Sequence, residues 1–168
     1  MWNEQYQRML RSFQRVQNYY DGLTGLEHYD GASVFPEFRD SVIHLFQDIF
    51  NLRDWLKNDQ KISVSNSDID STCSGNSSKF PNLHIARDVA NGSKHLRITR
   101  PSQSVDTRIA GVGHLEVSFG AGGEMKNTVL KHSIAIELGD SSLADALTVA
   151  GGCIAEWDEV LQNWGLKP

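Results

Sequence analysis

The sequence predicts a single α+β domain, residues 1–168, because helical periodicity dominates both ends of the chain and strand-like alternation fills the stretch before the last helix. A chain of 168 residues is long enough to bury a hydrophobic core without disulfides or a structural metal. We expect a four-helix bundle-like core with a three-stranded antiparallel β-meander, about residues 96–138, inserted before the last helix.

Two amphipathic helices are expected in the N-terminal third of the chain. The first carries an apolar stripe at spacings of three and four residues and ends at Asp21-Gly22; its members are Trp2, Tyr6, Met9, Phe13, Val16 and Tyr20. A loop with Gly25, Gly31 and Pro36 should follow. A second stripe then runs from Phe38 to Leu56, and this helix should stop near Asn58-Asp59.

The middle of the chain is predicted to contain a loop and a third helix. Residues 59–81 are rich in Ser, Asn and Asp, which predicts a mobile polar loop with room for a short helical turn. Pro81-Asn82 is a typical helix start. The residues that follow supply a narrow apolar face, made of Leu83, Ile85, Ala86, Val89 and Ala90.

The period changes after this helix. Three runs alternate between apolar and other residues, as half-buried strands do: Leu96 and Ile98, Leu115 to Phe119, and Leu130 to Leu138. The glycines of residues 120–123 predict a hairpin turn between the last two runs. The final helix should begin at a Ser141 or Ser142 cap, carry a stripe from Leu143 to Trp164 and end before Gly165.

Composition favours an ordinary reduced, cytoplasmic protein. Cys73, in a polar stretch, and Cys153, in an apolar helical pattern, form neither a disulfide framework nor a zinc cluster. The sequence shows no secretory leader and no apolar run of bilayer-spanning length, so we expect no membrane insertion. The net charge is −5, yet residues 79–108 hold six basic and two acidic side chains. An anionic partner should therefore meet that window.

Residues 84–100, HIARDVANGSKHLRITR, hold the candidate site. At about 100° per residue, four polar residues fall on one side of the third helix: His84, Asp88, Asn91 and His95. The simplest interpretation is the solvated face of an amphipathic helix. The functional interpretation rests on residue type, because two imidazoles, a carboxylate and flanking cations supply the acid, base and charge that phosphodiester cleavage needs.

Arg87-Asp88, followed by His95, resembles the arginine-polar-spacer-histidine motif of HEPN domains, although the spacer here is longer than is usual in that family. Many HEPN domains are metal-independent ribonucleases of toxin-antitoxin or phage-defence systems, built as helical bundles that dimerise around a shared cleft. The resemblance implies that Arg87 binds phosphate, that Asp88 takes the polar second position and that His95 is the acid or base. It also implies a homodimer, an RNA substrate and an antitoxin protein as partner.

Basic and polar neighbours complete this hypothesis. Lys94, Arg97 and Arg100 would bind the RNA backbone, and His84 and Asn91 would support the site. No cofactor is implied, since the 2′-hydroxyl of RNA can serve as the nucleophile. The segment Asn91-Gly92-Ser93-Lys94-His95 is also similar to one found in uncharacterised bacterial proteins, a resemblance that assigns no activity.

Alternatives remain open at the level of sequence. The chain could be a non-catalytic module that binds a protein or its own copy, or one that binds RNA without cutting it. A metal site from His84 and Asp88, completed by His95, His114 or His132, is stereochemically possible, but no metal-binding signature supports it. We therefore expect no metal.

Overall fold

The computed structural model describes residues 1–23, 31–74, 79–92, 108–119, 125–138 and 142–167. Its elements in chain order are α1 (Trp2–Leu23), α2 (Gly31–Asn58), α3 (Asn66–Ser74), α4 (Pro81–Gly92), β1 (Arg108–Phe119), β2 (Met125–Glu137), β3 (Leu143–Asp145) and α5 (Ala146–Asn163). This is an α+β fold in which helices predominate, as the sequence predicts.

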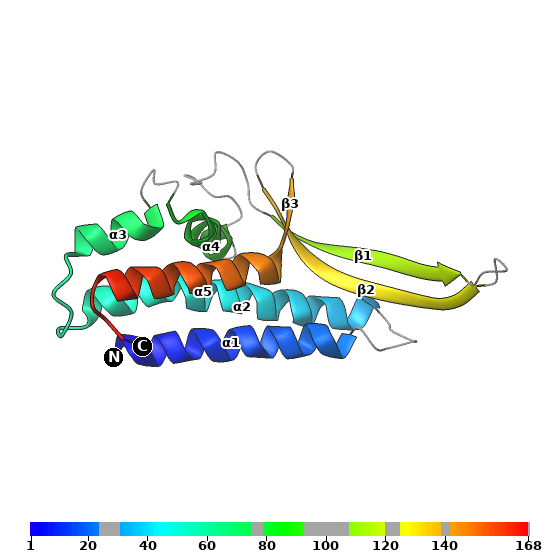
Figure 1. Ribbon diagram of the computed structural model, residues 1–168, viewed down its shortest axis with the longest axis horizontal. Coiled ribbons are helices and arrows are strands. Elements are labelled where there is room, and N and C mark those ends of the chain that lie inside the picture. The colour runs from blue at the N-terminus through cyan, green and yellow to red at the C-terminus, as the bar shows by residue number, and fades with distance from the viewer. Residues whose placement is uncertain (24–30, 75–78, 93–107, 120–124, 139–141, 168) are drawn as a thin grey trace.

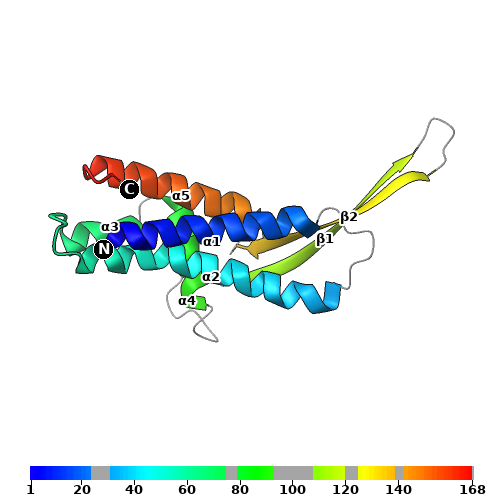
Figure 2. The same ribbon diagram turned by 90° about the horizontal axis from the view of Figure 1, so that it is seen from below.

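The long helices α1, α2 and α5 lie side by side, and α4 crosses them at a steep angle (Figures 1 and 2). The apolar stripes predicted from the sequence form their common core. Trp157 of α5 is completely buried, and its indole N–H donates to the backbone carbonyl of Ile49 in α2 at 3.1 Å. We call this assembly of helices the helical body.

The segment between α2 and α4 corrects the prediction of a mobile polar loop over 59–81. Residues 66–74 form the helix α3, and its Ile69 and Cys73 are buried. Lys57 of α2 donates to both carboxylate oxygens of Asp70, at 2.9 and 2.8 Å. The two apolar side chains and this ion pair hold a helix of nine residues against α2, longer than the short helical turn that the prediction allowed.

The start of α2 corrects a second prediction. Gly31 and Pro36 were expected in a loop, but α2 begins at Gly31 and Pro36 lies in its second turn. The end of α2 at Asn58 agrees with the prediction. A proline in the second turn has no N–H to donate to the carbonyl four residues before it, so α2 forms here with one intrahelical hydrogen bond fewer.

The sheet differs from the predicted meander. Its order is β1-β2-β3, all antiparallel; β1 and β2 pair over most of their length, whereas β3 pairs with only three residues of β2, Ala135–Glu137. The first predicted strand, near Leu96 and Ile98, lies outside the described residues. The third strand, β3, occupies residues that were expected to begin the last helix. That helix starts later, at Ala146, and its cap is Asp145, which accepts the Thr148 N–H at 2.8 Å.

Strands β1 and β2 form a long hairpin whose near end packs on the helical body. Ile134 and Ile136 of β2 are buried there. Farther along, the two strands extend beyond the helices in both views (Figures 1 and 2). We call Gly113–Phe119 together with Met125–His132, the half away from the body, the arm.

Candidate functional site

The helix α4 holds the described part of the predicted site. Its apolar residues Leu83, Ile85, Ala86, Val89 and Ala90 are buried, as predicted. The face that was expected to be solvated is buried as well: His84 is 5% exposed and Asp88 is 0% exposed. The interpretation of α4 as a surface helix with one wet side is therefore wrong at these two positions, because α4 packs against α2, α3 and α5.

Arg87 and Asp88 form an ion pair within α4. The Nε and Nη2 atoms of Arg87 each lie 3.2 Å from Oδ1 of Asp88. The side chain of Arg87 is 14% exposed, and that of Asp88 has no exposure. A carboxylate without access to water needs a cation and hydrogen bonds to offset its lost hydration, and Arg87 supplies both.

His84 lies one turn before this pair. Burial lowers its pKa, and the positive charge of Arg87 lowers it further, while the negative charges of Asp88 and Glu156 act in the opposite direction. The imidazole is therefore neutral at pH 7. A neutral histidine can accept a proton, yet one that is 5% exposed offers little access to a substrate.

A carboxylate on α5, which the sequence analysis did not select, fixes the start of α4. Glu156 accepts the backbone N–H groups of Asn82 and Leu83, at 3.1 and 2.9 Å, and the side-chain amide of Asn82 at 2.6 Å. These are N–H groups that the first turn of a helix leaves without intrahelical partners. No sequence signal near Pro81 points to this residue, because 74 positions separate Asn82 from Glu156.

Cys73 also differs from its prediction. It was expected in a polar loop, but it is buried in α3, and burial raises the pKa of its thiol to about 12, with Arg53 and Arg87 opposing that rise. Cys153 in α5 is completely buried, and burial raises the pKa of its thiol as well. Both cysteines are free thiols, protonated at neutral pH and therefore weak nucleophiles.

The structure brings Arg87, Asp88 and His84 together on α4, with Asn91 partly buried in the same helix. The other predicted site residues, Lys94, His95, Arg97 and Arg100, lie outside the described residues. His114 and His132 are placed only by the backbone of β1 and β2, where Gly113 pairs with His132. Within the described part of the chain, no three histidine, cysteine or acidic residues are grouped so that they could hold a metal ion.

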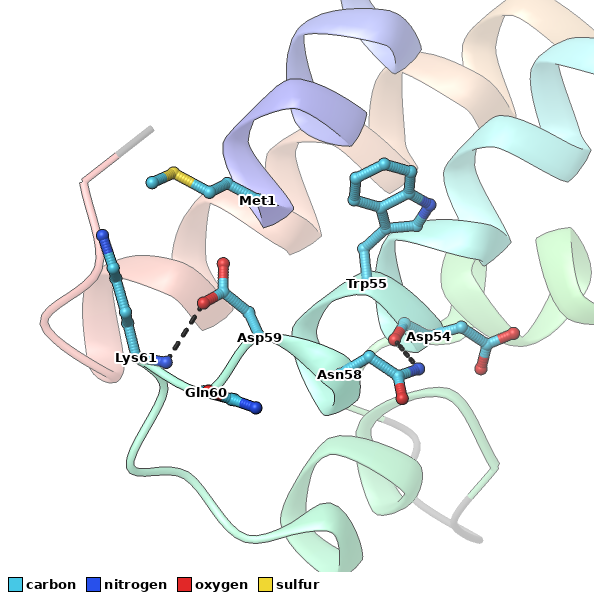
Figure 3. Close-up of a pocket in the computed structure, with 7 residues that line it drawn as sticks. All are labelled: Met1, Asp54, Trp55, Asn58, Asp59, Gln60 and Lys61. Atoms are coloured by element: carbon cyan, nitrogen blue, oxygen red, sulfur yellow. Dashed lines mark hydrogen bonds between the residues drawn. The ribbon is translucent and has the colours of Figure 1, made fainter.

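A hollow of about 580 Å³ lies away from α4, between the start of α1 and the end of α2 (Figure 3). It is lined by Met1, Asp54, Trp55, Asn58, Asp59, Gln60 and Lys61. Asp59 there accepts the backbone N–H groups of Trp2 and Lys61, both at 3.1 Å, and these bonds lower its pKa. Asn58 donates to the backbone carbonyl of Asp54 at 2.7 Å. The polar groups of this hollow thus bind backbone groups at the end of α2 and at the start of α1.

Comparisons with protein-family models, with curated proteins and with solved structures gave no match. None of the described helices is long and apolar enough to cross a membrane. The features that bear on function are therefore the packing of α4 and the placement of the hairpin.

Proposed function

We propose that this chain is a non-catalytic protein-binding module, with the arm as its binding surface. The observation that carries the proposal is the position of the arm, which extends beyond the helices that cover the near end of the same hairpin (Figure 2). An isolated two-stranded hairpin is marginally stable in water, and further strands or a packed layer are what stabilise it. A partner protein would supply that layer.

The burial of the α4 side chains supports the non-catalytic part of the proposal. Asp88 is inaccessible and bound to Arg87, and His84 is nearly inaccessible. A catalytic acid, base or phosphate ligand must reach the substrate, so these three residues are better suited to holding α4 in the core. Glu156 serves the same end from α5.

One observation favours ribonuclease-like chemistry as a second candidate. The side chain of Arg87 retains 14% exposure. Its Nε and Nη2 atoms both contact Oδ1 of Asp88, and this fixes the orientation of the guanidinium. A guanidinium held in one orientation is suited to binding a phosphate. If residues 93–107 place His95 near that guanidinium, the acid, the base and the phosphate ligand of a HEPN-like, metal-independent endoribonuclease would be complete. A toxin-antitoxin or phage-defence role would follow from that activity.

An RNA cleavage assay separates the two candidates. The full chain is incubated with a fluorescent single-stranded RNA in EDTA, beside Arg87→Lys and His95→Ala, and the cut fraction is followed over time. The binding module predicts no cleavage above the protein-free control in any sample. Cleavage by the wild type that both variants lose, with their melting temperatures unchanged, would replace this proposal with the ribonuclease.

A further inference from the structure

We infer that the outer face of α1 and the hollow at its start bind single-stranded nucleic acid, with the phosphates on α1 and one base in the hollow. The inference goes beyond the proposed function, because the hollow lies at the end of the helical body opposite the arm (Figure 1). It follows from three exposed arginines of α1, from a tryptophan beside them and from the polar lining of the hollow.

The exposed side of α1 carries a basic stripe. Residues 5–20 contain Arg8, Arg11 and Arg15 and no acidic residue, in a chain whose net charge is −5. All three arginines are exposed, and at about 100° per residue they fall within about 60° of one another around the helix. Helix α1 lies at the outside of the helical body in both views (Figures 1 and 2), so a long partner can reach these residues. We call them the arginine stripe.

The charges of the arginine stripe are available to a partner. Within the described ranges, none of its three members forms an ion pair, whereas Arg87 of α4 lies 3.2 Å from Asp88. Asp48 of α2, which lies against α1, accepts instead from Gln5 at 3.3 Å and from Ser12 at 2.6 Å. A guanidinium presents a planar fork of donors that matches a phosphate. The arginine stripe is therefore suited to an anionic partner that carries phosphates.

The length of the arginine stripe matches a short run of nucleotides. Arg8 and Arg15 are seven residues apart in sequence, which is about 10 Å along a helix. This is about three steps of a stacked strand, whose phosphates advance by about 3.4 Å each. Because a strand repeats its charge at every nucleotide, it can use all three arginines at once.

Trp55 of α2 connects the arginine stripe to the hollow. The guanidinium carbon of Arg8 lies 5.9 Å from the centroid of the Trp55 ring. Trp55 also lines the hollow of about 580 Å³, a volume within the roughly 300–1,000 Å³ of small-molecule sites. Figure 3 shows the indole on one side of the hollow, with Met1 and Asp59 on the other. A base stacks on an aromatic ring whatever the sequence, so a strand that passes Arg8 would bring its next base to this indole.

The other side chains of the hollow favour a base over a phosphate. Asp59 is held by the backbone N–H groups of Trp2 and Lys61, and these bonds lower its pKa, so its carboxylate is ionised at neutral pH. A carboxylate accepts several hydrogen bonds and can take the amino group of a base. It would repel a phosphate, as would Asp54. Lys61, exposed at the edge of the hollow, can bind the phosphate that is attached to the base.

This arrangement selects a single strand. In a duplex the bases are paired and stacked on one another, so the indole of Trp55 could not stack on them. The bases of a single strand can turn outward onto an aromatic side chain while the phosphates follow a basic track.

The salt dependence of binding tests the arginine stripe. Fluorescence anisotropy follows the binding of the full chain to a labelled oligonucleotide of about 12 nucleotides, within the roughly 4–16 that a single-strand-binding OB fold covers. RNA and DNA of one sequence distinguish the two sources of this chemistry. For three phosphate contacts, the logarithm of the affinity should fall against the logarithm of the salt concentration with a slope of about −2.

Charge variants assign that slope to α1. The double variant Arg11→Gln/Arg15→Gln should reduce the slope to about −0.7, because one phosphate contact remains. Arg39→Gln is the matched control, since Arg39 is also exposed but lies on the side of α2 nearly opposite Trp55. It should leave the slope unchanged.

An oligonucleotide of the same length without bases tests the stacking. It carries the same phosphates, so the wild type should bind it about ten-fold more weakly than the intact strand. Trp55→Ala should bind both strands equally, whereas Trp55→Phe should keep most of the difference. The comparison within the wild type uses the native protein and holds even if Trp55→Ala does not fold.

Three results would overturn the inference. The first is no binding of RNA or DNA up to about 100 μM protein at about 50 mM salt. The second is an unchanged slope in Arg11→Gln/Arg15→Gln. The third is equal affinity of the wild type for the intact and the base-free strand, which would indicate a surface for any polyanion, such as an acidic protein segment. Binding without cleavage leaves the proposed function intact, and cleavage would overturn that function without removing the binding site, so the two failures are distinguishable.

Discussion

The helical body and the arm differ in the helices and strands that lie around them (Figure 1). In the body, even charged side chains are enclosed: Asp88 has no exposure, and its partner Arg87 lies in the same helix. In the arm, the two strands extend beyond the helices of the body (Figure 1). The body thus encloses a charged pair within one chain, whereas under the proposed function the arm is completed by a partner.

This difference separates two kinds of candidate site. Chemistry-bearing residues on α4 attract attention in the sequence, yet packing against α2, α3 and α5 uses them for the core. The hairpin is of interest instead for its placement, since it extends beyond the helices (Figure 1). If the body is stable on its own, substitutions inside it should change its free energy of unfolding most, and changes to the arm should change it least.

Asp88→Ala should cause the largest loss. Removing a carboxylate with no exposure leaves Arg87 beside a cavity without its anion, and breaking a buried pair costs about 3–5 kcal/mol. Urea unfolding of the full chain measures the change. Asp70→Ala is the control, because Asp70 also pairs with a cation but is 42% exposed, and should lose under about 1 kcal/mol. Equal losses for the two variants would show that the burial of Asp88 has no energetic consequence.

Gly152→Ala should have the next largest effect. A Cβ at this position would lie 2.6 Å from Nδ2 of Asn82, so either the Asn82 side chain would have to leave its hydrogen bond to Glu156 or α4 and α5 would have to move apart. Overpacking of this kind costs about 1–3 kcal/mol.

The neighbouring glycine provides the control for that contact. At Gly151 the nearest atom, Cζ of Phe13, is 3.9 Å from a built Cβ, an ordinary contact. Gly151→Ala should therefore raise stability by about 0.5–1 kcal/mol through helix propensity. The melting temperatures of both variants are compared with that of the wild type. A Gly152→Ala protein as stable as the wild type would mean that the contact between α4 and α5 is looser than described.

The helices were predictable where an apolar stripe or a terminal signal in the local sequence was enough to locate them. The stripe from Trp2 to Tyr20 locates α1, and Pro81 locates the start of α4. For α3 the sequence predicts at most a short helical turn, since two buried apolar residues among Ser, Asn and Asp give no helical period. Its stability comes from packing on α2, and such tertiary contacts override local composition.

The candidate site was less predictable for a related reason. Arg87 and Asp88 look in sequence like an ordinary solvated pair, and the wheel of α4 places Asp88 opposite the apolar residues. A helical wheel assumes that the polar face is exposed to solvent. In the structure, α2, α3 and α5 pack against α4 and cover part of that face. Glu156 could not be linked to α4 at all, because its role depends on the meeting of two helices far apart in the chain.

The pH dependence of stability gives a smaller, directional effect. Because the folded pKa of His84 lies below its ordinary value of 6.5, the unfolded chain binds a proton in the interval between the two values and the folded chain does not. Stability should therefore fall as the pH is lowered from 7 through that interval. His84→Gln should reduce the fall, whereas His44→Gln, at an exposed position on α2, should leave it unchanged. The urea midpoint of each protein is measured at several pH values. If His84→Gln and the wild type lose stability equally as the pH falls, the assignment to His84 is wrong.

Shortening the arm should have the smallest effect on the body. Replacing Gly113–His132 by Asn-Gly joins Val112 to Ser133, a directly paired position, through a two-residue turn, and keeps the buried Ile134 and Ile136. If the body is complete without the arm, its free energy of unfolding should change by less than about 0.5 kcal/mol when both proteins are compared as monomers at high dilution. A shortened chain that unfolds at high dilution would mean that the arm belongs to the core of its own subunit, and the contrast between body and arm would then have to be abandoned.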